Sequence, residues 1–173
     1  MHIAMAVISL LSVWCLGDWR HWKLYHPAML FMAVGNLLYQ FFTTNYFLWR
    51  FKPDFYLNHT TTELIYTFIT FPATALLFIS RFPGKRRRQY IHITVWIAIY
   101  AIMEYVYMLA DRIEYRHGWS LGWSVMFDCV MFPMLIFHHK HPLAAYGTSV
   151  IICVTLLWLF QVPVHVPTEQ RTG

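Results

Sequence analysis

The sequence predicts an all-α membrane protein, a polytopic helix bundle of about six transmembrane helices. Of its 173 residues, 58% are hydrophobic and 12% are charged, whereas an ordinary soluble domain has about 25% charged residues. Six apolar stretches occupy almost the whole chain, and each is long enough, or nearly so, to cross the roughly 30 Å hydrocarbon core of a bilayer as a helix. The connections are too short to fold alone, so we expect residues 1–173 to form a single integral membrane domain.

The apolar stretches give the expected spans, in order, at about 2–17, 27–47, 61–80, 89–110, 119–138 and 142–162. A cleaved signal peptide is the alternative for the first stretch, but no Lys or Arg precedes it and no small-x-small cleavage site ends it. We therefore keep it as a short span. Pro142 suits the first turn of the sixth helix. Pro72 and Pro133 predict kinks in the third and fifth spans, since proline removes a backbone hydrogen bond.

Lysine and arginine are distributed unevenly between the two sides of this bundle. The first, third and fifth connections hold eight of them, and the second and fourth connections with the C-terminus hold five. Most of the difference comes from one run beside a span, Lys85, Arg86, Arg87 and Arg88, which the positive-inside rule places in the cytoplasm. Both termini are therefore predicted outside. The net charge of +5 comes from such flanking residues, so the expected partner of this run is anionic lipid headgroups and not nucleic acid. A protein partner is left open.

Neither the cysteines nor the histidines form a metal-binding pattern. Cys15, Cys129 and Cys153 lie inside apolar stretches without a C-x-x-C spacing, so we expect them to be small core residues. Four basic residues in a row, 138–141, fit an interfacial turn better than a metal site, because Lys140 opposes a cation. The sequence predicts no metal and no cofactor, and it assigns no catalytic residue.

Polar residues recur at helical spacing in four of the spans, which predicts four polar helix faces turned toward a common interior. From these faces we take eight candidate ligand-binding residues: Asn36, Gln40, Thr67, Tyr100, Glu104, Tyr107, Ser124 and Asp128. The alternative for the neutral residues is helix association, in which such hydrogen bonds contribute about 0.6 to 2 kcal/mol each.

Glu104 and Asp128 are the most costly of these side chains, because a charged carboxylate at the bilayer centre costs roughly 2.5 to 3.5 kcal/mol. At 1.5 Å per residue, Asp128 lies roughly 14 Å deep and Glu104 roughly 22 Å from the cytoplasmic start of its span. We therefore expect the two acids to approach one another and to share a proton. The alternative is that each is a neutral, hydrogen-bonded structural acid.

Three other acids have structural explanations. Thr60-x-x-Glu63 predicts a capping box at the start of the third span, in which the two side chains satisfy free backbone donors. Asp111 and Glu114 lie beside two arginines of the same loop, which predicts ion pairs at the membrane interface. Glu63 is therefore expected to cap a helix.

A set of short motifs runs in order along nearly the full chain. They are Gly17-Asp18-Trp19, Tyr25-x-Pro27, Leu37-Leu38-Tyr39, Asn58-His59-Thr60, Phe71-Pro72, Glu104-Tyr105, Gly118-Trp119, Trp123-Ser124 and Met131-Phe132-Pro133. In order and spacing they resemble a family of small multi-spanning membrane proteins from spore-forming Gram-positive bacteria. The resemblance implies a bacterial plasma membrane. That family has no established activity, so the resemblance supplies no catalytic residues.

Three hypotheses for function follow. The first is a multi-pass bundle whose outward-facing polar cavity, centred on Glu104 and Asp128, binds a cation or a polar or lipid-derived small molecule. Seven of the eight acids fall in the outer half or outside, which would attract external cations. The second is a non-catalytic accessory or assembly protein that packs against a membrane partner. The third is a membrane-embedded enzyme acting on a lipid, with Glu104 and Asp128 or His117 as acid and base. We rank it last, because no span positions a nucleophile beside a base.

Overall fold

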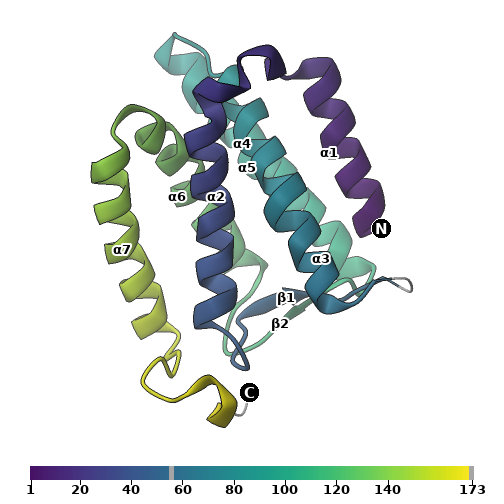
Figure 1. Cartoon of the computed structure of the whole chain (residues 1–173), viewed down its shortest axis with the longest axis vertical. Coiled ribbons are helices and arrows are strands. Elements are labelled where there is room, and N and C mark those ends of the chain that lie inside the picture. The colour runs from purple at the N-terminus through teal and green to yellow at the C-terminus, as the bar shows by residue number, and fades with distance from the viewer. Residues whose placement is uncertain (55–56, 172–173) are drawn as a thin grey trace.

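The computed structural model describes residues 1–54 and 57–171 of the chain. Within them the fold is mostly helical, which confirms the predicted all-α class (Figure 1). The elements are, in order, α1 (His2–Leu16), α2 (Trp22–Phe42), β1 (Trp49–Phe51), α3 (His59–Ile65), a π-helical turn (Tyr66–Thr70), α4 (Phe71–Ser80), α5 (Arg86–Leu109), β2 (Ile113–Tyr115), α6 (Leu121–Lys140) and α7 (Pro142–Leu159). Short 3₁₀ turns lie at Trp19–His21 and Thr168–Gln170.

Each of the six apolar stretches forms one helical rod, but six membrane spans is the wrong number. Four rods in the described residues are long and apolar enough to cross a membrane: His59–Ser80, α5, α6 and α7. A fifth is reached only if α1 and the segment Trp19–Phe42, which are bent by 93°, count as one broken span. The physical reason is length and polarity. The 15 residues of α1 reach about 22 Å at 1.5 Å per residue, and α2 carries Lys23, Asn36 and Gln40.

The third rod is continuous although its hydrogen bonding changes along its length. α3 passes into the π-helical turn Tyr66–Thr70, and α4 follows with Pro72 in its first turn. Proline has no N–H to donate and its ring clashes with the carbonyl four residues earlier, so a widened turn before Pro72 relieves both problems. The sequence predicted a kink in this rod, and the structure has a change of hydrogen-bonding pattern directly before Pro72. Pro133, by contrast, lies inside α6, which runs on as a single α-helix.

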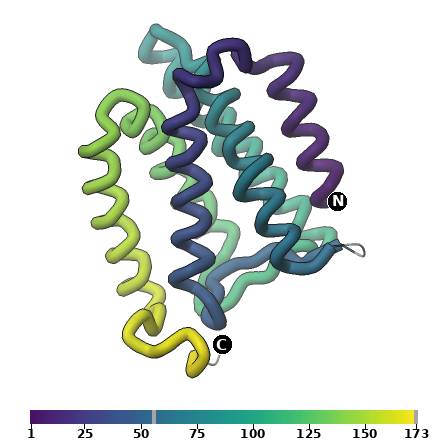
Figure 2. The backbone as a smooth tube through the Cα atoms, viewed as in Figure 1, coloured from purple at the N-terminus to yellow at the C-terminus, as the bar shows by residue number. Residues whose placement is uncertain are grey.

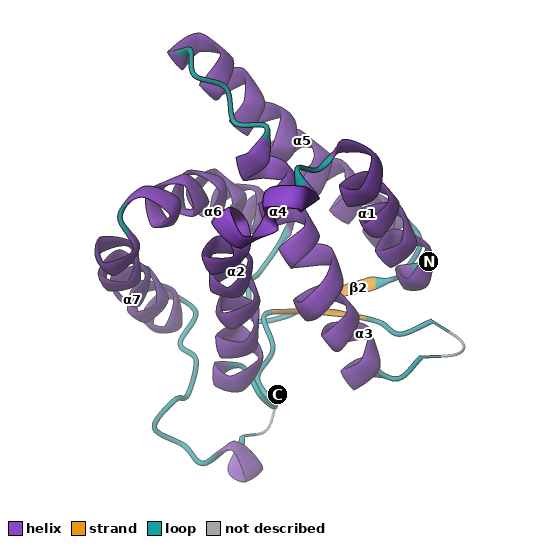
Figure 3. Cartoon of the chain, turned by 45° about the horizontal axis from the view of Figure 1, so that its top comes forward, coloured by secondary structure: helices purple, strands orange, loops and turns teal. Residues whose placement is uncertain are grey.

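A short antiparallel sheet, which the sequence did not predict, closes one end of the bundle. Trp49 of β1 lies opposite Tyr115 of β2, and Arg50 lies opposite Glu114. The sheet joins the loop after α2 to the loop after α5, and it lies beside α3 (Figure 3). We call this end of the molecule the sheet end. The opposite end, which carries the run Lys85 to Arg88 at the start of α5, is called the basic end (Figure 2).

The largest of the three buried apolar clusters in the described residues lies toward the basic end. Its fully buried members include Ala28 of α2, Phe78 of α4 and Phe132 of α6, and Trp96 of α5 packs against them. Large apolar side chains on α1, α2, α5 and α7 are exposed on the outer surface of the bundle, as expected for helices that face lipid tails.

α2 and the third rod are close together at one end and apart at the other. α2 packs along α4, touches the π-helical turn less, and hardly contacts α3. Figures 1 and 2 show the two rods diverging toward the sheet end. This divergence opens the space in which the candidate site lies.

Candidate functional site

A cavity of about 790 Å³ lies at the sheet end, between α2, α3 and the loops around the sheet. Its wall contains one carboxylic acid, Glu63, and three arginines, Arg50, Arg116 and Arg171. Four threonine side chains, Gln40 and His59 add hydrogen-bonding groups. The cavity wall therefore combines apolar surface with an acid at one place and a surplus of positive charge at others.

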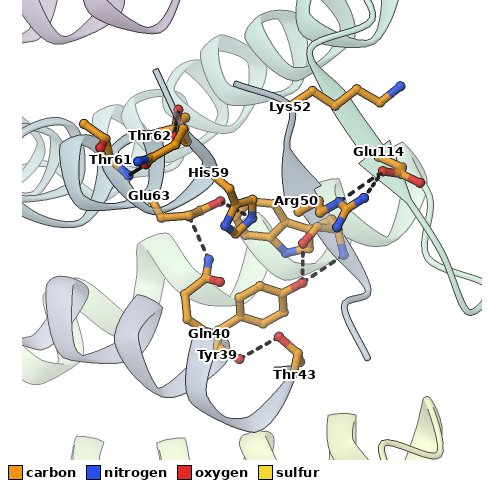
Figure 4. A network of polar contacts seen from close by, with 12 residues as sticks. Tyr39, Gln40, Thr43, Arg50, Lys52, His59, Thr61, Thr62, Glu63 and Glu114 are labelled. Atoms are coloured by element: carbon orange, nitrogen blue, oxygen red, sulfur yellow. Dashed lines mark hydrogen bonds and ion pairs between the residues drawn. The ribbon is translucent and has the colours of Figure 1, made fainter. Parts of the chain in front are cut away.

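Glu63 is the buried acid of this cavity, with 6% of its surface exposed. Gln40 of α2 donates from Nε2 to Glu63 Oε2 at 2.7 Å. Among the described residues Glu63 Oε1 has no hydrogen-bond partner, and His59 Nε2 lies 3.8 Å from it, beyond hydrogen-bonding distance. Figure 4 shows Gln40 and His59 approaching Glu63 from two elements. A buried carboxyl oxygen that no described residue pairs, on an acid that lines the cavity, can accept a hydrogen bond from a bound donor or contact a cation.

The capping box predicted for Thr60 and Glu63 is wrong. Asn58 is the N-cap of α3, and its side-chain oxygen accepts a hydrogen bond from the backbone N–H of Thr61 at 2.7 Å. Because Asn58 occupies the capping position, Thr60 falls inside the first turn and the Glu63 side chain is free for tertiary contacts. The same change of register puts His59 one helical turn before Glu63, on the same side of α3.

A second set of hydrogen-bonded polar side chains lies next to Glu63. Asn36 of α2 donates to Thr67 Oγ1 at 2.7 Å, and the Thr67 hydroxyl donates to the backbone carbonyl of Glu63 at 2.7 Å. Asn36 and Thr67 are both buried. Three of the eight predicted ligand-binding residues, Asn36, Gln40 and Thr67, thus gather around Glu63.

The rim of the cavity is basic. Arg50 donates from Nε and Nη2 to Glu114 Oε2 at 3.0 and 2.9 Å, and Arg116 Nε donates to Glu114 Oε1 at 3.1 Å. Both guanidinium groups also lie over the ring of Phe47, at 4.0 and 5.0 Å from its centroid. Burial opposes ionisation of Glu114, but the hydrogen bonds from Arg50 and Arg116 outweigh it and lower the pKa of this carboxyl. One carboxylate thus holds two arginines in place and leaves the rim net positive.

Glu104 belongs to a different cluster. Its Oε1 accepts hydrogen bonds from Tyr115 Oη at 2.6 Å and from Ser124 Oγ at 2.5 Å, and Trp119 Nε1 donates to the same Ser124 hydroxyl at 2.9 Å. Burial, with the adjacent Glu104 carboxyl, raises the pKa of the Tyr115 hydroxyl. This arrangement joins β2 to α5 and α6. It corresponds to the alternative interpretation of Glu104, that of a hydrogen-bonded structural acid.

Asp128 is buried in α6, and its Oδ2 has no hydrogen-bond partner among the described residues. In the described part of the chain no hydrogen bond joins Asp128 to Glu104. Tyr100, one turn before Glu104 on α5, donates instead to Thr74 Oγ1 at 2.9 Å. The expected common interior is therefore divided, and neither acid lines the cavity.

Tyr107 lies in a third cluster, which sequence reasoning missed. It accepts a hydrogen bond from Tyr66 Oη at 2.6 Å, and the Tyr66 hydroxyl pairs with His2 Nδ1 at 2.9 Å. His2 is fully buried, and its Nε2 pairs with the Lys52 carbonyl at 2.9 Å. Asp54 accepts from the backbone N–H of His2 at 2.8 Å. These contacts dock the start of α1 against the third rod and α5.

The cysteines are also placed differently from the prediction. Cys15 and Cys129 are exposed and Cys153 is partly exposed, so none is a buried core residue. A thiol behaves as a small hydrophobic group, and the outer surface of a membrane bundle is apolar, so apolar sequence context did not distinguish lipid-facing from core positions. Within residues 1–54 and 57–171, no group of three or more His, Cys, Asp and Glu side chains is placed to hold a metal ion.

Together the fold and the cavity define a class, a small helical bundle of membrane character with an acid-containing cavity at the sheet end. No family model, curated protein or solved structure matches the chain.

Proposed function

We propose that this protein is a multi-pass protein of the bacterial plasma membrane that binds a small polar molecule in the cavity around Glu63. The observation that carries the proposal is the buried Glu63 carboxyl in the cavity wall, which receives one hydrogen bond from Gln40 and has its second oxygen unpaired among the described residues. Leaving a buried acceptor unsatisfied costs about 1–3 kcal/mol. A bound donor group would recover that free energy.

The centre of the proposed site moves from Glu104 and Asp128 to Glu63. Glu104 already accepts two hydrogen bonds from the chain, whereas Glu63 lines the cavity. The rim also changes the expected ligand, because the three arginines favour an anionic group near the mouth. We therefore propose a polar molecule with both a donor group for Glu63 and an anionic group for the rim, in place of a free cation.

The polar interior supports binding more than passage across the membrane. Polar contacts continue inward from Glu63 through Asn36 and Thr67, but toward the basic end the helices pack around Phe78 and Phe132, both fully buried and apolar. A site that is polar at one end and closed by packed aromatic rings at the other suits a ligand that enters and leaves by the same side. With the positive-inside orientation, that side is the outside.

Native mass spectrometry of the protein isolated from its own membranes tests the proposal. We expect wild type to carry a non-covalent adduct that Glu63→Gln has lost, because the amide cannot pair with a donor or cation as a carboxylate does. Asp111→Asn is the matched control, since Asp111 lies at the same end, is 82% exposed and pairs with Lys52 outside the cavity wall. An adduct-free wild type, or the same adduct on Glu63→Gln, would overturn the proposal.

A further inference from the structure

We infer that the ligand is a membrane phospholipid with a phosphoethanolamine headgroup, which enters the cavity sideways between α2 and α3. The inference rests on the proposed function and names the class of molecule that the same cavity takes. Three features carry it: a lateral opening with apolar edges, a buried acid for an ammonium group, and a basic rim for a phosphate.

The lateral opening follows from the divergence of α2 and the third rod. Leu37 of α2 and Leu64 of α3 both line the cavity and are 41% and 46% exposed, so each has one side toward the cavity and one toward the surroundings of the bundle. Along α3 and the π-helical turn, Phe68 follows Leu64 at the next turn and is also exposed. Such side chains suit acyl chains, and a soluble molecule entering from the water would not need them.

The acid at the base of the cavity selects the headgroup amine. A primary ammonium has three N–H donors. Glu63 offers one oxygen without a partner among the described residues and one shared with Gln40. Charge-assisted hydrogen bonds between an ammonium and a carboxylate are about twice as strong as neutral ones. A quaternary ammonium such as choline has no N–H and cannot form them.

The rim supplies the partner for the phosphate. Arg50 and Arg116 share the single Glu114 carboxylate, and their remaining N–H groups can reach a phosphate, for which the guanidinium fork is well shaped. In Figure 4 Arg50 lies near Glu114, across from Glu63 and Gln40. The acid and the arginines thus lie at separate places in the cavity wall, so an amine and a phosphate of one headgroup can each have their own partner.

The test compares lipids that differ only in the headgroup. Purified protein is exchanged into micelles with equal amounts of phosphatidylethanolamine, phosphatidylcholine and phosphatidylglycerol of identical chains, and retained lipid is measured by native mass spectrometry. We expect wild type to retain phosphatidylethanolamine roughly tenfold over phosphatidylcholine, the ratio that one charge-assisted hydrogen bond supplies. Glu63→Gln should lose this preference, because its retention of phosphatidylethanolamine falls to the level that wild type shows for phosphatidylcholine. Arg116→Gln should lower retention of all three lipids, and Lys52→Gln, which lies outside the cavity wall, should change nothing.

The other outcomes show whether this inference alone, or the proposed function as well, is wrong. Equal retention of the three lipids by wild type, or a preference for phosphatidylglycerol, overturns the inference. If soluble O-phosphoethanolamine displaces the lipid at equal concentration, the inference that the ligand is a lipid is wrong, and only the inferred headgroup chemistry stands. Loss of every lipid from a wild type that still carries another adduct sensitive to Glu63→Gln overturns the inference alone. The absence of any such adduct overturns both.

Discussion

Replacing Tyr66 by Phe should weaken the attachment of α1 to the bundle. The loss of unfolding free energy can be worked out from the contacts of the Tyr66 hydroxyl. The Tyr66 hydroxyl joins two partners, donating to Tyr107 Oη at 2.6 Å and pairing with His2 Nδ1 at 2.9 Å. Phenylalanine keeps the ring, which stacks on Phe51 with centroids 3.9 Å apart. The substitution therefore removes hydrogen bonds and leaves the packing in place.

The magnitude comes from the two interactions lost. Hydrogen bonds between helices in membrane proteins contribute on average about 0.6 kcal/mol, and the fully buried His2 would keep one ring nitrogen without a partner, which costs about 1–3 kcal/mol. Together these terms predict a loss of roughly 2 kcal/mol, or about thirtyfold in the unfolding equilibrium constant. Tyr66→Phe and Tyr107→Phe should be less than additive, since they break one shared bond.

The assay is unfolding of the purified protein by dodecyl sulfate in mixed micelles, followed by circular dichroism. Tyr105→Phe is the control, because Tyr105 is exposed on the same helix as Tyr107 and makes no hydrogen bond in the described part of the chain. If Tyr66→Phe and Tyr105→Phe gave the same unfolding free energy, the buried contact between α1, the third rod and α5 would not contribute as argued.

Three further predictions concern the core, the rim and the orientation. Phe78→Ala, which empties a fully buried site, should lower the unfolding free energy by about 3–5 kcal/mol in the same assay, whereas Phe41→Ala at an exposed site should change it little. Wild type should lose thermal stability as pH falls below about 4, because the lowered pKa of Glu114 contributes stability that is complete above the unfolded pKa and is lost as pH falls through the folded one; Glu114→Gln should flatten this part of the profile. With the native cysteines replaced, Asp111→Cys should react with a membrane-impermeant maleimide in intact cells and Arg86→Cys should not.

Each of the three can fail clearly. Equal losses for the buried and the exposed phenylalanine would contradict the core assignment. An acid profile unchanged in Glu114→Gln would show that the two arginines gain nothing from this carboxylate. Labelling at position 86 without labelling at 111 would invert the orientation and turn the cavity toward the cytoplasm.

Composition and periodicity predicted where the helical rods lie, because the length of each apolar stretch determines the length of its helix. The fifth stretch was placed at 119–138 and α6 covers Leu121–Lys140, and the fourth and sixth agree similarly. The second rod begins and ends five residues earlier than predicted, at Trp22 and Phe42, because aromatic residues after Phe42 extend the apolar pattern into a loop. The predicted number of membrane spans was wrong because α1 is short and α2 is polar.

The site could be predicted only in part. Helical spacing found Asn36, Gln40 and Thr67, which do meet, but it could not show which polar faces meet which. Glu63 was assigned to a cap because the Thr60 pattern looks the same whether or not Asn58 caps the helix first. The basic rim depends on the pairing of Arg50 with Glu114 across two three-residue strands, which are too short to carry an alternating pattern.

The central claim is that the cavity around Glu63 is a binding site, and an experimental density map of the protein isolated from its membranes without added ligand tests it most directly. The account predicts non-protein density in the space between Glu63, Gln40 and the guanidinium group of Arg50. Density for the chain alone, with α2 and α3 closed together and the side chains of Glu63 and Arg50 in direct contact, would contradict it.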